Sequence, residues 1–192
     1  AAKPRLYQRR IRRVRRGAAM PAGIGLALGG EDRLRVLIVT DAWAPQINGV
    51  VRTLEMLGRD LRSLGHEVRY ATPEGRISVP MPTYPEIRLS LFPRRALEKE
   101  IRTFAPDAIH IATEGTLGLS ARAICIKYSI PFTTSFHTRF PEYVHARFSF
   151  ISEARVYRFL RWFHGPATAM MVATQSLKRE LEGHGFKNLR IW

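Results

Sequence analysis

From Arg35 onward, short apolar runs alternate with amphipathic segments, and this alternation constrains the fold more than any other feature of the sequence. The first run, Arg35–Thr40 (RVLIVT), is rich in β-branched residues, which is typical of a strand buried on both faces of a parallel sheet. The segment after Val50 repeats apolar residues at helical spacing until Gly65, which is well placed to end a helix. Because strand and helix go on alternating to Ile191, the pattern predicts an α/β domain with a doubly wound parallel sheet.

The individual elements can be placed from the same periodicity. A proline-rich stretch between residues 73 and 85 interrupts the alternation, and one short strand is expected after it. We expect strands at 35–40, 68–72, 87–89, 107–112, 132–136, 169–173 and 188–191. We expect helices at 50–64, 95–104, 117–128, 151–163 and 177–182.

Length and composition exclude several classes of protein. The chain has 192 residues, enough for one domain with a sizeable core, and its 45% hydrophobic and 24% charged residues exclude a fully disordered chain. No stretch approaches the roughly 18 apolar residues of a membrane-spanning helix. The single cysteine, Cys125, excludes an internal disulfide framework, and its position between two isoleucines on an expected helix favours packing over nucleophilic chemistry.

Positive charge is concentrated near the N-terminus. The chain carries 31 Lys and Arg against 16 Asp and Glu, a net charge of +15, and residues 1–19 contribute +8 of it without an acidic residue. Such a run, followed by prolines and glycines, predicts a basic, disordered extension over 1–33 and a folded domain over 34–192. Three interpretations of the extension stay open: a non-native or unconserved tail with Met20 as a later true start, an arm that binds polyanions or lipids, and an export signal.

Doubly wound sheets bind ligands beyond the carboxyl ends of their strands, so the loops that follow the strands form the candidate site. In the first such loop, Asn48-Gly49 directly precedes a helix, where backbone N–H groups and the helix dipole favour an anion. Gly49 would let a phosphate approach the backbone closely. The alternative is that Asn48 only caps the helix. The loop has no GxGxxG fingerprint and no Walker A motif, which argues against a dinucleotide-binding oxidoreductase.

Two further loops carry polar side chains. Glu114 could bind hydroxyl groups or act as an acid or base, or it could be a carboxylate that stabilises a helix start. His137 stands just past a buried strand, where a site role competes with that of a structural hydrogen-bonding residue. The aromatic and arginine residues interleaved over 136–163 fit an acceptor groove, a surface for single-stranded nucleic acid or membrane, or packing of one helix face. No spacing typical of a metal site occurs, so no metal is expected.

Together, these loops and their flanking elements resemble a known family. The chain resembles the N-terminal half of family-four glycosyltransferases, above all their bacterial α-mannosyltransferase-like subgroup, over Arg35 to Trp192. The segments that carry the resemblance are LIVTDAWAPQINGVVRTLEMLGRDLRSLGHEV, DAIHIATEGTLGLSAR, PFTTSFHTRFPEYV and VATQSLKRELEGHGFKNLRIW. The resemblance implies a GT-B architecture, in which this Rossmann-like domain holds the acceptor. A C-terminal domain, absent from these residues, would hold the donor.

The resemblance also implies roles for individual residues. Asn48 and Gly49 match the loop that lies near the donor diphosphate, where many members of the family have two glycines. His137 matches the histidine that lines the donor sugar and the catalytic centre. The residues that would border the acceptor or the cleft are Glu114, Thr138, Arg139 and Tyr143.

By this resemblance, the whole protein would transfer a hexosyl group, mannosyl in the subgroup, from a GDP- or UDP-linked sugar with retention and without a cofactor or metal. The acceptor would be a carbohydrate or a lipid-linked molecule. We expect a cytoplasmic protein, peripheral at the anionic inner face of the membrane, that binds no nucleic acid. Because the diphosphate-gripping residues belong to the C-terminal domain, we expect these residues to be inactive alone. The alternative is a non-catalytic α/β module that binds nucleic acid or anionic lipid.

Overall fold

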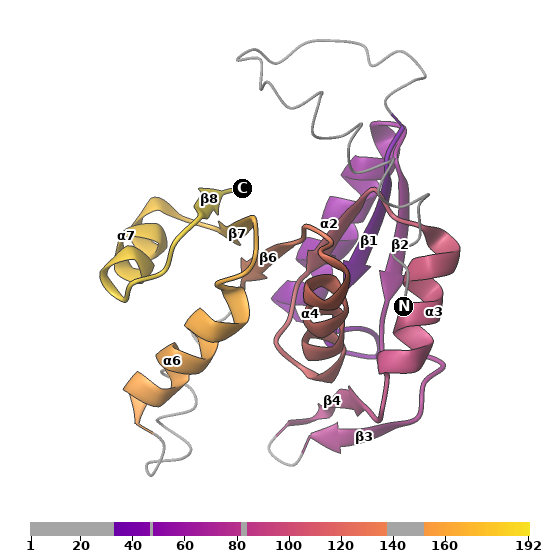
Figure 1. The fold of residues 1–192 in the computed structure, drawn as a ribbon, viewed down its shortest axis with the longest axis horizontal. Helices are drawn as coiled ribbons and strands as arrows, with labels where there is room; N and C mark the ends of the chain where they lie inside the picture. The colour runs from indigo at the N-terminus through magenta and orange to yellow at the C-terminus, as the bar shows by residue number, and fades with distance from the viewer. Residues whose placement is uncertain (1–32, 47, 82–83, 138–151) are drawn as a thin grey trace.

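A six-stranded parallel sheet runs through the described residues of the computed structural model, which are 33–46, 48–81, 84–137 and 152–192 (Figure 1). The strands lie in the order β2-β1-β5-β6-β7-β8, so the chain adds strands first on one side of β1 and then on the other. This confirms the predicted doubly wound, Rossmann-like α/β fold. The strands are β1 (Arg35–Val39), β2 (Glu67–Ala71), β5 (Ala108–Ile111), β6 (Thr133–Phe136), β7 (Ala169–Val172) and β8 (Leu189–Ile191). The helices are α2 (Gly49–Ser63), α3 (Arg94–Phe104), α4 (Thr116–Tyr128), α6 (Glu153–His164) and α7 (Gln175–Gly183).

Alternating side chains of β1 explain why helices cover both faces of the sheet. Val36 and Ile38 join Leu54 of α2 in one hydrophobic cluster. Leu37 and Val39 join residues of α3 and α4 in another. Since both faces of the strand are buried, the sequence of β1 lacks the polar alternation of a strand with one solvated face.

A small hairpin stands apart from the main sheet. It consists of β3 (Ser78–Met81) paired antiparallel with β4 (Tyr84–Ser90), where only one short strand at 87–89 was predicted. The prolines that argued against a strand are tolerated because each strand of a two-stranded ribbon has a free edge. Arg88 supports the pairing, since its Nη2 donates to the carbonyl of Ser78 at 2.8 Å.

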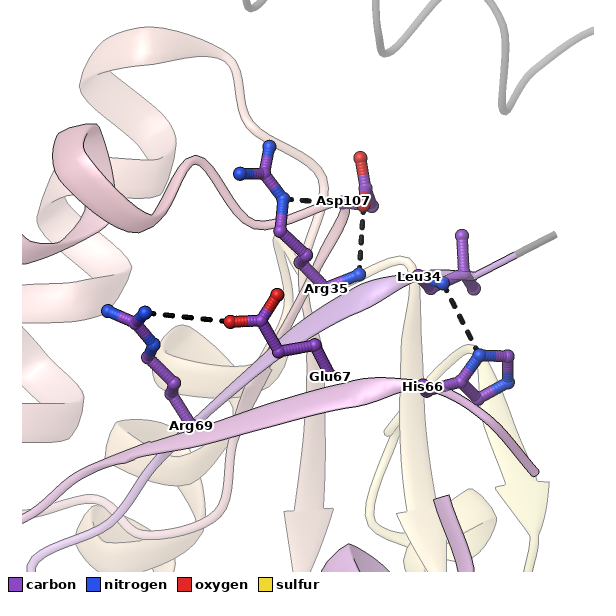
Figure 2. A network of polar contacts seen from close by, with 6 residues as sticks. All are labelled: Leu34, Arg35, His66, Glu67, Arg69 and Asp107. Atoms are coloured by element: carbon purple, nitrogen blue, oxygen red, sulfur yellow. Dashed lines mark hydrogen bonds and ion pairs between the residues drawn. The ribbon is translucent and has the colours of Figure 1, made fainter. Parts of the chain in front are cut away.

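Polar contacts fix the amino ends of three neighbouring strands (Figure 2). The backbone N–H of Arg35 donates to Asp107 Oδ2 at 2.9 Å, and the backbone N–H of Asp107 donates to the Arg35 carbonyl at 2.7 Å. On the other side of β1, the backbone N–H of Leu34 donates to His66 Nδ1 at 3.3 Å. These contacts tie β1 to β5 and β2 at the edge of the sheet opposite to the loops of the candidate site.

The pairing between β5 and β6 is short, and it divides the sheet into two halves. His110 lies opposite Thr133 and Ile111 opposite Thr134, and we call this pairing the joint. Two clusters lie beneath α2, α3 and α4, and one of them also takes in Phe132, Phe163 and Ala167 from beyond the joint. A third cluster fills the space between β6, β7, α6 and α7. In Figure 1 the elements of the two halves gather on opposite sides of β6.

Arg122 of α4 connects the two halves. Its Nε donates to the carbonyl of Phe163 at 3.0 Å, and its Nη2 donates to the carbonyl of Trp162 at 2.6 Å. The guanidinium carbon also lies 3.8 Å from the centroid of the Trp162 ring. A buried cation thus binds the last carbonyls of α6, where the helix dipole favours positive charge.

Candidate functional site

The candidate site lies at the carboxyl ends of β1, β5 and β6. The order of the strands reverses between β1 and β5, since β1 is followed by β2 on one side and, later in the chain, by β5 on the other. This switch point is where doubly wound sheets bind their ligands. The three loops singled out in the sequence all begin at this edge of the sheet.

Asp41 is a buried carboxylate at the switch point. Its Oδ1 accepts from the backbone N–H of Leu117 at 2.9 Å and from the hydroxyl of Thr116 at 3.3 Å. Its Oδ2 accepts from the hydroxyl of Thr113 at 3.0 Å and from the backbone N–H of Gly118 at 3.3 Å. Burial raises the pKa of the Asp41 carboxyl, and these hydrogen bonds oppose the rise. Asp41 therefore caps the positive end of α4 from across the switch point.

Two glycines make this approach feasible. A Cβ on Gly115 would lie 2.3 Å from Asp41 Cγ, and a Cβ on Gly118 would lie 1.9 Å from the carbonyl oxygen of Thr113. Sequence reasoning singled out this loop but missed Asp41 as its partner. The available signal was an acidic residue directly after a continuous apolar strand.

Asn48 caps α2, as one of the two interpretations expected. Its Oδ1 accepts from the backbone N–H of Val51 at 3.0 Å, and its Nδ2 donates to Gln46 Oε1 at 3.0 Å. The cap satisfies one of the N–H groups that open a helix, so it does not compete with an anion for the others. Gly49 is exposed, and a Cβ there would meet nothing within 4 Å. The fold itself therefore does not require glycine at this position, and the anion site stays a prediction.

Glu114 faces α6. The backbone N–H groups at the start of α4, which a helix-start carboxylate would bind, donate to Asp41 instead. Oε1 of Glu114 lies 3.2 Å from Nε2 of buried His164, within ion-pair range but outside hydrogen-bond geometry. The other ring nitrogen of His164, Nδ1, lies 2.9 Å from the hydroxyl oxygen of Thr134. Glu114 thus links the loop after β5 to α6 across the joint, and its role toward a ligand stays a prediction.

His137 ends a chain of polar groups between β5 and β6. Its Nε2 lies 2.7 Å from Ser135 Oγ, which lies 3.1 Å from His110 Nε2. The other nitrogen of His110, Nδ1, lies 2.9 Å from Thr133 Oγ1. Burial lowers the pKa of His110 to about 3. Burial also lowers the pKa of His137, against the opposing effect of the Glu114 carboxylate, so both rings are neutral at neutral pH.

The remaining predicted positions divide into those that the structure describes and those that it does not. Thr138, Arg139 and Tyr143 lie outside the described residues, and their roles stay predictions. Cys125 is fully buried, and burial raises the pKa of its thiol to about 12, which confirms the packing interpretation. Packing also accounts for one face of α6, whose buried residues are Val156, Tyr157, Leu160, Phe163 and His164.

The described part of the chain has neither a cluster of metal ligands nor a membrane-spanning helix. Across residues 33–46, 48–81, 84–137 and 152–192, no group of three or more His, Cys, Asp and Glu side chains is placed to hold a metal ion. Within the same ranges, each helix is too short or too polar to cross a membrane.

The site combines chemistry suited to a polar ligand with a recognised sequence pattern. It offers the amino end of α2, a half-buried carboxylate and a neutral imidazole at one edge of a Rossmann-like α/β domain. The pattern of the family described as Glycosyltransferase Family 4 matches residues 47–192, well over half of the chain. The chain belongs to Glycosyltransferase Family 4.

Individual relatives are similar over a third to a half of their own length. Sulfoquinovosyl transferase SQD2 of Arabidopsis thaliana is 29% identical over 179 residues, which cover 84% of this chain and 35% of the relative. Alpha-monoglucosyldiacylglycerol synthase of Acholeplasma laidlawii is 33% identical over 127 residues, which cover 58% of this chain and 32% of the relative. GDP-mannose-dependent alpha-mannosyltransferase of Mycolicibacterium smegmatis is 25% identical over 176 residues, which cover 83% of this chain and 47% of the relative.

Proposed function

We propose that this chain is the acceptor-side domain of an enzyme that transfers a hexosyl group from a nucleotide-diphosphate sugar. The observation that carries the proposal is the amino end of α2 at the switch point of a family-four chain, where Gly49 leaves open space in front of the helix. A helix amino end attracts anions through its N–H groups and its dipole, and a diphosphate is such an anion. Family membership favours this function over the non-catalytic binding module.

His137 and Glu114 complete the proposed site. A neutral imidazole can donate one hydrogen bond to a sugar hydroxyl or accept one from it. A carboxylate can accept hydrogen bonds from the hydroxyl groups of an uncharged ligand. We assign His137 to the donor sugar and the reacting centre, and Glu114 to the border of the acceptor. Thr138, Arg139 and Tyr143 belong to the acceptor side of the same proposal.

The proposed reaction retains the configuration at the anomeric carbon. An acceptor hydroxyl oxygen bonds to that carbon on the face from which the nucleotide diphosphate leaves, and the departing diphosphate oxygen takes the hydroxyl proton. This chain contributes placement of the acceptor and stabilisation of the charge on the leaving group. The scheme invokes no metal or cofactor. It requires a donor-binding domain, so we expect residues 1–192 alone to give no turnover.

The relatives guide the choice of substrates. One is named for GDP-mannose and one for a monoglucosyldiacylglycerol product, so GDP-mannose and UDP-glucose are the first donors to test, with carbohydrate and diacylglycerol acceptors. A lipid-linked acceptor would place the protein in the cytoplasm at the inner face of the membrane. Co-sedimentation with anionic vesicles tests that location, and recovery of the protein in the supernatant would contradict it.

Gly49→Val in the full-length protein tests the diphosphate site. The new side chain meets no protein atom within 4 Å of its Cβ but would occupy the space that we assign to phosphate, so donor affinity should fall at least tenfold while stability changes little. Gly183→Val is the matched control, because Gly183 ends α7 and also has nothing within 4 Å of a Cβ. Equal donor KM in the wild type and Gly49→Val would reject the assignment.

His137→Ala tests the reacting centre. We expect a fall in kcat of roughly a hundredfold if the imidazole contacts the developing charge, with an unchanged far-UV circular dichroism spectrum. Initial rates at saturating donor give the comparison. A variant with wild-type kcat would remove His137 from the site.

A further inference from the structure

We propose that Ser135 and His110 are positioning residues that orient the His137 ring. They engage its Nε2 in a hydrogen bond, which leaves Nδ1 for the ligand. The inference rests on the proposed function, in which His137 meets the donor sugar. It concerns two residues that would not touch the ligand themselves. Ser135 is 1% exposed and His110 is 7% exposed, whereas His137 is half-buried at the site.

The geometry of the strands brings the three groups together. Ser135 and His137 are two positions apart at the end of β6, so their side chains leave the same face of the sheet. His110 is on the neighbouring strand β5, and the register that sets it opposite Thr133 places its ring beside Ser135. Buried groups of the sheet therefore contact the His137 ring, which also lies 5.4 Å from the Trp192 ring, centroid to centroid.

The hydroxyl of Ser135 couples the two rings because it has one proton. Among the described residues, its hydrogen-bond partners are the Nε2 atoms of His110 and His137, at 3.1 Å and 2.7 Å. A hydroxyl has one proton and two lone pairs, so it cannot donate to both rings, and its own proton is paired only when it donates to one ring and accepts from the other. Both rings are neutral at neutral pH, so each carries one N–H.

The two rings should therefore have opposite tautomers. If Ser135 donates to His110, then His110 carries its proton on Nδ1 and His137 carries its proton on Nε2. If Ser135 donates to His137, the two assignments are reversed. In both cases Nε2 of His137 is engaged by Ser135, and Nδ1 has one defined character toward a ligand, acceptor in the first case and donor in the second.

The first test measures tautomers and needs no turnover. In full-length protein labelled with ¹⁵N-histidine, the ring nitrogens should show one tautomer for His137 and the opposite one for His110 at pH 7. Ser135→Ala removes the coupling hydroxyl, so His137 should move to a mixture of both tautomers. The matched control is Thr134→Val, which removes a hydroxyl bonded to a buried histidine on the opposite face of β6 and should leave the His137 signals unchanged.

A second variant guards against loss of folding in the first. His110→Phe keeps a ring in place but frees the Ser135 hydroxyl to turn either way, so His137 should again populate both tautomers. Identical tautomers in the wild-type rings, or an unchanged His137 tautomer in the folded Ser135→Ala and His110→Phe proteins, would overturn the proposal.

The second test separates positioning from a structural role. Ser135→Ala should lower kcat roughly five- to tenfold, the worth of one hydrogen bond, with donor KM within about twofold of wild type. Ser135→Thr, which keeps the hydroxyl, should restore most of kcat. Wild-type kcat in Ser135→Ala would contradict positioning. If the wild-type protein transfers no sugar, the proposed function fails, whereas the ring tautomers still decide whether Ser135 and His110 hold His137.

Discussion

Replacement of Asp41 gives the sharpest stability prediction, because four hydrogen bonds converge on its buried carboxylate. In Asp41→Asn, the amide oxygen can take the place of Oδ1 and keep the bond from the Leu117 N–H. The amide nitrogen then stands where Oδ2 accepted from Gly118, so two donors face each other. Asp41→Ala removes both acceptors and leaves the backbone N–H groups of Leu117 and Gly118 without their partner from the loop after β1.

The magnitude follows from the groups left unpaired. One orphaned buried N–H costs about 1–3 kcal/mol. Loss of a negative charge at a helix amino end costs about 0.3–1 kcal/mol. Burial of the charged carboxylate also costs free energy, as the raised pKa of Asp41 indicates, and both substitutions remove that cost, which reduces the loss of stability. We therefore expect a loss of about 1–3 kcal/mol for Asp41→Asn and about 2–6 kcal/mol for Asp41→Ala, against the roughly 5–15 kcal/mol of a typical domain.

Urea denaturation at pH 7 provides the measurement, with m-values checked for equality between variants. Asp60→Asn is the matched control, since Asp60 is exposed on α2 and the same substitution there should change the free energy of unfolding by less than about 0.5 kcal/mol. An Asp41→Asn protein as stable as the wild type, or less stable than Asp41→Ala, would refute the reasoning.

Two further predictions concern a buried histidine and a buried arginine. The pKa of His110 is about 3 in the folded protein and about 6.5 when unfolded, so the unfolded state binds the proton first and wild-type stability falls as pH drops below 6.5. The stability advantage of wild type over His110→Gln should therefore shrink by about 2 kcal/mol between pH 7 and pH 5 in urea titrations, and a constant difference would argue against a buried neutral ring. In Arg122→Lys, one ammonium group cannot replace the two guanidinium nitrogens that donate to the Phe163 and Trp162 carbonyls, so the free energy of unfolding should fall by about 1–3 kcal/mol. The same substitution at exposed Arg158 should lower it by less than about 0.5 kcal/mol. Thermal unfolding distinguishes these outcomes, and equal losses in both arginine variants would contradict the proposed tie between α4 and α6.

Local periodicity was enough to predict the α/β fold with its parallel sheet, and with it the edge of the sheet at which the candidate site lies. The apolar run of β1 and the helical spacing up to Gly65 depend on neighbours close in sequence, and Gly65 does adopt a left-handed φ of +88° after α2. The cap by Asn48 is local in the same sense, because its acceptor serves an N–H three residues later. Such features are encoded within a few residues of where they act.

The contacts that organise the site are not local, which is why they were missed. Asp41 binds amides 76 and 77 residues further along the chain, and His110 meets Ser135 25 residues away. Each contact depends on which strands are neighbours and in which register, and a single sequence does not fix that register. The strand β3 was missed for a different reason. Its partner β4 is close in sequence, but the prolines of this stretch interrupt the strand pattern, and pairing with β4 makes β3 a strand in spite of Pro80.

The joint between β5 and β6 affects the order in which parts of the protein can fold during synthesis on the ribosome. All elements of the first half precede residue 131, so most of its core can form before the second half has been synthesised. That core nevertheless includes Phe163 and Ala167, which emerge later. Until α6 has been synthesised, the first half therefore has an incomplete core, and the Arg122 guanidinium lacks its carbonyl partners. Docking of α6 then completes the core and brings His164 beside Glu114 in the same event.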